Sequence, residues 1–169
     1  MLRISGCVLV IAAGAMFGWM RLDGLRQRCR ALAAFAEALR RGSAELGTSL
    51  TPTGELMALL AEDSNPWVSR FFASVRDDLA ARGAPCCPEC WQAAVDGCGI
   101  LEPPERQALS ALATVLGQYG AEETCAALDR CARQLETAGE EVRRRMPDAA
   151  RLCLGISLTV SALLAIVLL

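Results

Sequence analysis

The sequence contains no histidine and no lysine, and all 17 basic residues among its 169 are arginine. Without an imidazole, the chain lacks the side chain that most often serves as a general base, as the partner of a nucleophile or as a metal ligand. The net charge is only −2, so no strong overall field favours nucleic acid. No glycine-rich loop follows a strand pattern, which removes a nucleotide cradle as well. We therefore expect no nucleic-acid partner, no cofactor and no catalytic residues.

Charged side chains are also absent from two long apolar runs, at residues 4–20 and 152–169. At ~1.5 Å per residue, each run reaches roughly 26 Å as a helix, slightly less than a ~30 Å hydrocarbon core. Flanking leucines and a little bilayer thinning can cover the difference. We predict a transmembrane helix at residues 1–21 and another at residues 147–169.

Each run also has an alternative interpretation. Arg3 and the tripeptide Ala13-Gly14-Ala15 are similar to the start and the cleavage site of a secretory signal peptide, but the apolar run continues to Met20. The second run could instead be a buried core helix. However, it carries no polar stripe, and the chain is too short to enclose such a helix.

Arginines gather at the inner ends of both runs, whereas the outer ends carry almost no basic residues. By the positive-inside rule, residues 22–146 are cytoplasmic and both termini face out, as expected of a cell-membrane protein with two spans. Such a cluster also attracts anionic lipid headgroups, by ~1 kcal/mol per charge. The membrane-flanking residues are Arg21, Arg143, Arg144, Arg145 and Arg151.

Between the runs, apolar residues recur at helical spacing and no convincing strand pattern occurs. Helices are predicted at about 22–42, 51–62, 66–82, 88–97, 103–117 and 122–145. Short connections favour antiparallel neighbours, so we expect an all-α fold, an antiparallel six-helix bundle flanked by the two transmembrane helices. Six is an even number, so the bundle starts and ends on one side, which fits two spans in one membrane.

Several helix ends carry recognisable signals. Thr51-Pro52 and Asn65-Pro66 each combine an N-cap residue with a first-turn proline. Gly42 and Gly83 are expected to end the helices before them, and Pro147 to kink the chain before the second span.

The helix at 66–82 has the strongest apolar stripe and is expected to be the heaviest element of the core. The predicted core residues are Leu25, Cys29, Leu32, Phe35, Ala36, Leu39, Leu56, Leu59, Leu60, Trp67, Val68, Phe71, Phe72, Val75, Leu79, Trp91, Ala94, Val95, Leu109, Leu112, Val115, Leu116, Cys125, Leu128, Cys131, Ala132, Leu135, Ala138 and Val142.

Nine cysteines are many for this length, but an odd number spread through helical patterns does not describe a disulfide framework. Cys87 and Cys90 form a C-x-x-C at a predicted helix start, where the helix dipole lowers a thiol pKa. A redox dithiol is therefore one hypothesis, and a zinc site that also uses Cys98 is another. Neither has its usual context, so a cysteine-rich helix start with no such role stays open beside them.

Short motifs occur in a recognisable order: Met1-Leu2-Arg3, residues 32–39 with Glu37, Thr51-Pro52, Trp91 and the segment 109–117. In order, spacing and total length, the chain resembles the stage III sporulation protein AB family of endospore-forming bacteria. The likeness covers nearly the full length. Gln118-Tyr119-Gly120 departs from it, because family members usually carry an acidic residue soon after the preceding Leu-Gly pair.

The resemblance implies a non-enzymatic, membrane-anchored scaffold subunit of a transenvelope complex that links mother cell and forespore. The family's helical domain is similar to the cytoplasmic domain of type II secretion F proteins, an inner-membrane platform. The implied partners are other subunits of the complex, membrane lipid and, by analogy, a cytoplasmic secretion-type ATPase, and an oligomer is compatible with this role. The alternatives are a membrane-tethered thiol oxidoreductase using Cys87 and Cys90, and an unrelated membrane adaptor.

Overall fold

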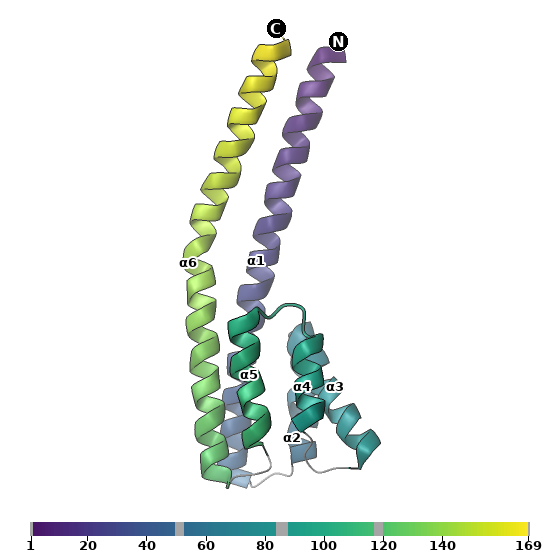
Figure 1. Ribbon diagram of the computed structural model, residues 1–169, viewed down its shortest axis with the longest axis vertical. Helices are drawn as coiled ribbons and strands as arrows, with labels where there is room; N and C mark the ends of the chain where they lie inside the picture. The colour runs from purple at the N-terminus through teal and green to yellow at the C-terminus, as the bar shows by residue number, and fades with distance from the viewer. Residues whose placement is uncertain (1, 50–52, 84–87, 117–119, 169) are drawn as a thin grey trace. The chain divides into compact units, whose positions relative to one another are not determined.

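The computed structural model describes residues 2–49, 53–83, 88–116 and 120–168. For residues 2–15, 17, 18, 21, 49, 53, 121 and 147–168 it describes the backbone alone. The described ranges contain helices and turns and no strand, which confirms the all-α prediction. The helices are α1 (Leu2–Ser49), α2 (Thr53–Ala61), α3 (Pro66–Arg82), α4 (Pro88–Gly97), α5 (Pro103–Val115) and α6 (Ala121–Leu168) (Figure 1).

The chain divides into two compact units. One consists of residues 30–139 and contains α2 to α5 together with the adjoining parts of α1 and α6. The other consists of residues 1–29 and 140–169. In the first unit, α2 packs on α3, α3 on α4, and α4 on α5, so each short helix contacts the next one in the chain.

The two long helices continue past the ends that the sequence predicts for them. α1 is unbroken from Leu2, so no break in the helix separates the predicted first span from the first bundle helix. α6 likewise continues through Pro147 to Leu168. Among the described residues, no helix is both long enough and apolar enough to cross a membrane. The predicted spans at 1–21 and 147–169 fall mostly on residues whose side chains lie outside the described part.

The prediction that Gly42 ends the first bundle helix is wrong, because α1 continues to Ser49. A Cβ placed on Gly42 would lie 3.4 Å from Leu60 Cδ1, so α2 packs closely at this point. Farther along α1, the Ser43 hydroxyl donates to the Cys125 carbonyl at 3.4 Å, and the Cys125 thiol donates to the Ser43 carbonyl at 3.2 Å. These contacts with α2 and α6 offset the ~1 kcal/mol that glycine costs inside a helix.

The ends of α3 follow the sequence signals. The Trp67 N–H donates to the Asn65 side-chain oxygen at 3.0 Å, as an N-cap requires, and Pro66 stands in the first turn. Gly83 ends the helix with φ 62°, the left-handed conformation that glycine adopts without steric cost. The cap predicted at Thr51-Pro52 lies outside the described residues.

An aromatic cluster forms the centre of the 30–139 unit. The Phe71 ring meets the rings of Phe35, Phe72 and Trp91 edge-on, with centroids 5.4, 5.2 and 5.1 Å away. The Trp91 indole N–H donates to the Leu109 carbonyl at 2.7 Å, which ties α4 to α5. Phe71 and Phe72 both come from α3 and are buried, as the apolar stripe of this helix predicted.

Most predicted core residues are buried, but six are only half-buried and Leu59 on α2 is exposed. The half-buried residues are Leu25, Cys29, Trp67, Val115, Cys125 and Ala138. Leu59 is 48% exposed, whereas Met57, which the sequence pattern left out, is 2% exposed. α2 is short and buries the face that carries Leu56, Met57 and Leu60, so Leu59 projects away from its neighbours. The prediction that Leu59 belongs to the core is therefore wrong.

Candidate docking surface

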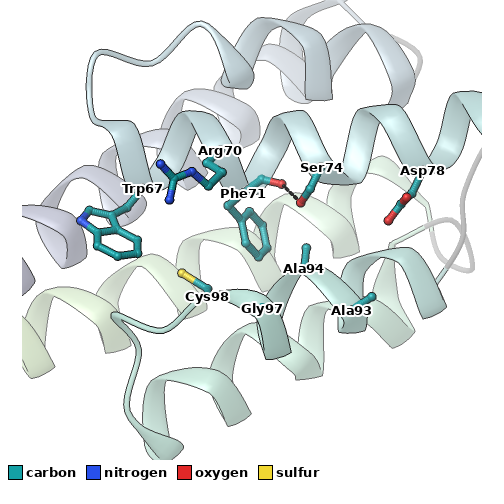
Figure 2. A pocket seen from close by; sticks show the side chains of 9 residues that line it. All are labelled: Trp67, Arg70, Phe71, Ser74, Asp78, Ala93, Ala94, Gly97 and Cys98. Carbon is teal, nitrogen blue, oxygen red and sulfur yellow. Dashed lines mark hydrogen bonds between the residues drawn. The ribbon is translucent and has the colours of Figure 1, made fainter.

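An open groove of about 240 Å³ lies between α3 and α4 (Figure 2). Since α3 and α4 pack directly on one another, their caps and core residues fix the position of this groove. The lining residues are Trp67, Arg70, Phe71, Ser74, Asp78, Ala93, Ala94, Gly97 and Cys98.

The floor of the groove is apolar and its α3 edge is polar. Phe71 is 3% exposed and Cys98 is 6% exposed, and both belong to the core as well as to the groove. On the α3 edge, the Arg70 guanidinium lies 5.8 Å from the centroid of the Trp67 ring, within reach of a cation–π interaction. Asp78 lies farther along the same helix (Figure 2). The groove therefore combines an apolar surface with one charge of each sign.

The thiol of Cys98 contributes to the apolar floor. Burial raises the pKa of Cys98 above its ordinary value, and this effect exceeds the opposing effects of a backbone hydrogen bond at Ile100 and of the nearby Arg106 and Arg70. The thiol is thus neutral at physiological pH, and a protonated thiol is a weak nucleophile. The groove offers Cys98 as a small apolar side chain.

The size of the groove indicates what it can accept. Sites for small organic ligands usually enclose ~300–1,000 Å³ and surround most of the ligand. The present groove has about 240 Å³ and is partly open to solvent, which is room for side chains of another polypeptide. It is better suited to protein docking than to a metabolite.

A second groove of about 410 Å³ lies between α5 and α6 and includes Glu105, Gln134 and Ala138. Glu105 is only 3% exposed, and its carboxylate accepts the Glu102 N–H at 2.7 Å. This contact is half of a reciprocal capping box at the start of α5. The most buried polar group in the groove therefore serves the helix end.

The predicted thiol pair is only partly described. Cys90 lies in α4 and is 1% exposed, and a buried structural thiol is normally inert. Cys87 lies outside the described residues, so the redox pair stays a prediction. In the ranges that the structure describes, no group of three or more His, Cys, Asp and Glu side chains is placed to hold a metal ion.

Of the predicted membrane-flanking arginines, Arg143, Arg144 and Arg145 are exposed on α6, and Arg145 forms an ion pair with Glu141. The side chains of Arg21 and Arg151 lie outside the described part. The α3–α4 groove was not predicted from the sequence. The spacing of Trp67 and Arg70, three residues apart on one helix, was its available signal, because such pairs are neighbours on a helix surface.

The fold and its surface define an all-helical bundle protein with open grooves between neighbouring helices. The stage III sporulation protein AB family matches residues 3–169, so the chain belongs to this family and is a sporulation-related protein. This match confirms the resemblance found in the sequence. No curated protein and no solved structure matches the chain.

Proposed function

We propose that the protein is a non-enzymatic, membrane-anchored scaffold subunit of a sporulation transenvelope complex between mother cell and forespore. Family membership supports the sporulation role. One observation on α1 supports the membrane anchor. Three large apolar residues are exposed to solvent, Met16 by 67%, Trp19 by 73% and Met20 by 67% of their surface. Large apolar side chains gathered on a surface are typical of sites that contact lipid or another protein.

These three residues belong to the predicted first span, directly before Arg21. Tryptophan is enriched where hydrocarbon meets headgroups, because its ring is apolar and its N–H is polar. The proposal therefore places Trp19 at the cytoplasmic interface of the membrane. The exposed arginines Arg143 and Arg144 precede the second apolar run, and they support the same orientation by the positive-inside rule.

The scaffold part of the proposal uses the helical bundle as a docking body. An aromatic cluster that holds three helices together gives neighbouring grooves a fixed shape, which suits recognition without rearrangement. In this proposal the partners are other subunits of the sporulation complex. By the likeness to type II secretion F proteins, a cytoplasmic secretion-type ATPase is a further partner.

Membrane fractionation of the untagged full chain tests the anchor. We expect the protein to float with membranes on a density gradient, to resist an alkaline carbonate wash and to require detergent for extraction. Protease added outside right-side-out vesicles should leave residues 22–146 intact, and the same protease should digest them in inverted vesicles. A protein that stays monodisperse in detergent-free buffer after a high-speed spin would falsify the proposal.

The buried position of Cys90 gives no support to the thiol oxidoreductase hypothesis. A double variant, Cys87→Ser with Cys90→Ala, tests it directly. We expect the variant to keep its fold and its sporulation activity, because neither thiol has a chemical task in a scaffold. Loss of sporulation in a variant with native circular dichroism would favour the oxidoreductase.

A further inference from the structure

The polar edge of the α3–α4 groove is nearly symmetric about its middle. Arg70, Ser74 and Asp78 are spaced by four residues, so they form one ridge along α3. Arg70 and Asp78 each lie about 6 Å of helix rise from Ser74, on opposite sides of it, as Figure 2 shows. A rotation by 180° about an axis through Ser74 therefore exchanges a positive position for a negative one.

We propose that the groove binds a second copy of this chain. The α3 ridges of the two copies run antiparallel across a two-fold axis near Ser74, and Arg70 of each copy pairs with Asp78 of the other. A two-fold interface needs a surface that is complementary to itself, and opposite charges on either side of a small central residue meet this need. The inference deepens the proposed scaffold function, because it names one component that the scaffold docks.

Both charges are available for this pairing. Within the described residues, the ion pairs involve neither Arg70 nor Asp78, although the adjacent Arg76 and Asp77 pair with each other. The Trp67 ring beneath Arg70 limits the motion of the guanidinium, so less conformational freedom is lost on binding. Tryptophan and arginine are also the residue types enriched where interfaces gain most of their affinity.

The opposite wall of the groove is built from small residues of α4, Ala93, Ala94 and Gly97. A Cβ built on Gly97 would meet no atom within 4 Å, so this wall leaves space for an incoming ridge. The ridge of each copy can thus enter the groove of the other. Two copies held in one membrane also meet at a raised effective concentration, so a modest interface suffices.

Charge reversal in two differently tagged copies of the full chain tests this inference. Both copies are co-expressed and extracted in mild detergent, and one tag is used to recover the other. We expect wild-type copies to co-purify. In a culture where both copies carry Arg70→Asp, or both carry Asp78→Arg, like charges face each other and recovery should fall about tenfold or more.

The decisive arm pairs one copy carrying Arg70→Asp with one carrying Asp78→Arg. One copy then has two acids on its ridge and the other has two bases, so recovery should return toward the wild-type level. Arg133→Asp on the exposed surface of α6 is the matched charge reversal and should leave recovery unchanged. Arg70→Gln removes the positive charge without adding repulsion and should give an intermediate loss of recovery. This variant replaces a charge-reversed variant that fails to fold.

Three results would overturn the inference: wild-type copies that do not co-purify, single reversals with no effect, or a mixed pair of natively folded variants that stays apart. The first result is the one expected if a different subunit occupies the groove. Each of them leaves flotation of the chain with membranes unaffected, so failure of this interface is distinguishable from failure of the membrane-anchored scaffold.

Discussion

Replacing Phe71 by alanine tests whether the aromatic cluster holds the 30–139 unit together. Phe71 is 3% exposed and contacts three rings, Phe35 from α1, Phe72 from α3 and Trp91 from α4. Removal of this ring leaves a space that the edge-on neighbours cannot fill without losing their own contacts. The cost therefore has a transfer part and a cavity part.

Phenylalanine-to-alanine changes in cores cost about 3–5 kcal/mol, and each edge-on ring pair contributes about 0.5–1.5 kcal/mol within such a total. Phe71 also borders the open groove, so water can enter part of the space that the ring leaves. We therefore expect the lower half of the range, about 3–4 kcal/mol, for Phe71→Ala. At about 4 °C per kcal/mol for a unit of this size, the midpoint of thermal unfolding should fall by roughly 12–16 °C.

The assay is thermal unfolding of the detergent-solubilised full chain, followed by near-ultraviolet circular dichroism, which reports the packing of Trp91 and its neighbours. Leu59→Ala is the control, because Leu59 is 48% exposed and should change stability by no more than about 0.5 kcal/mol. A shift below about 4 °C for Phe71→Ala, or an equal shift for Leu59→Ala, would refute the assignment of Phe71 to the centre of the core.

Three smaller changes test local features. Asn65→Ala removes the acceptor of the Trp67 N–H and should cost about 1 kcal/mol in urea unfolding, unlike Ser64→Ala. Gly83→Ala should cost about 1 kcal/mol in the same assay, because alanine is strained at φ 62°. Burial raises the pKa of Cys131 from 9.0 to about 12, so the folded chain keeps a proton that the unfolded chain releases. The stability that the neutral Cys131 thiol contributes is therefore complete below pH 9 and is lost as pH rises toward 12. Cys131→Ala should flatten this decline in the free energy of unfolding, and an unchanged decline would contradict the raised pKa of Cys131.

The sequence predicted those parts of the fold that depend on neighbouring residues. The apolar spacing in α3 placed Val68, Phe71 and Leu79 in the core, and all three are buried. The caps at Asn65 and Gly83 were equally predictable, because each acts on the backbone within a few residues of itself. In these places the local pattern and the final packing agree.

Packing between distant segments explains where the sequence interpretation failed. Gly42 has the local signature of a helix end, but its role is decided by Leu60 on α2. The next residue, Ser43, exchanges hydrogen bonds with Cys125, 82 residues away in the chain. The spacing of neighbouring residues carries no information about contacts between distant segments. The continuation of α1 and the exposure of Leu59 could therefore not be predicted from that spacing.

The groove was missed for a related reason. On the sequence, Arg70, Ser74 and Asp78 read as the ordinary solvent-facing side of an amphipathic helix. Only the packing of α4 beside α3 places the small residues Ala93 and Gly97 opposite them and turns a polar face into one edge of a groove. The two membrane spans, by contrast, stay a sequence prediction, because most of their side chains lie outside the described residues.

The helical period of α3 places the core residues on one face of the helix and the proposed interface residues on another. Successive residues of α3 are rotated by about 100°, so the positions next to Arg70 and Ser74 in the chain, Phe71 and Val75, point into the core while the ridge points outward. Both core residues are nearly fully buried, at 3 and 2% exposure. Their packing therefore fixes the rotation of α3 about its own axis, and with it the direction in which Arg70 and Asp78 present their charges. In the proposed interface, a ridge held in this way meets the same ridge of a second copy, related by the two-fold axis, without first having to be ordered, which lowers the entropy lost on docking.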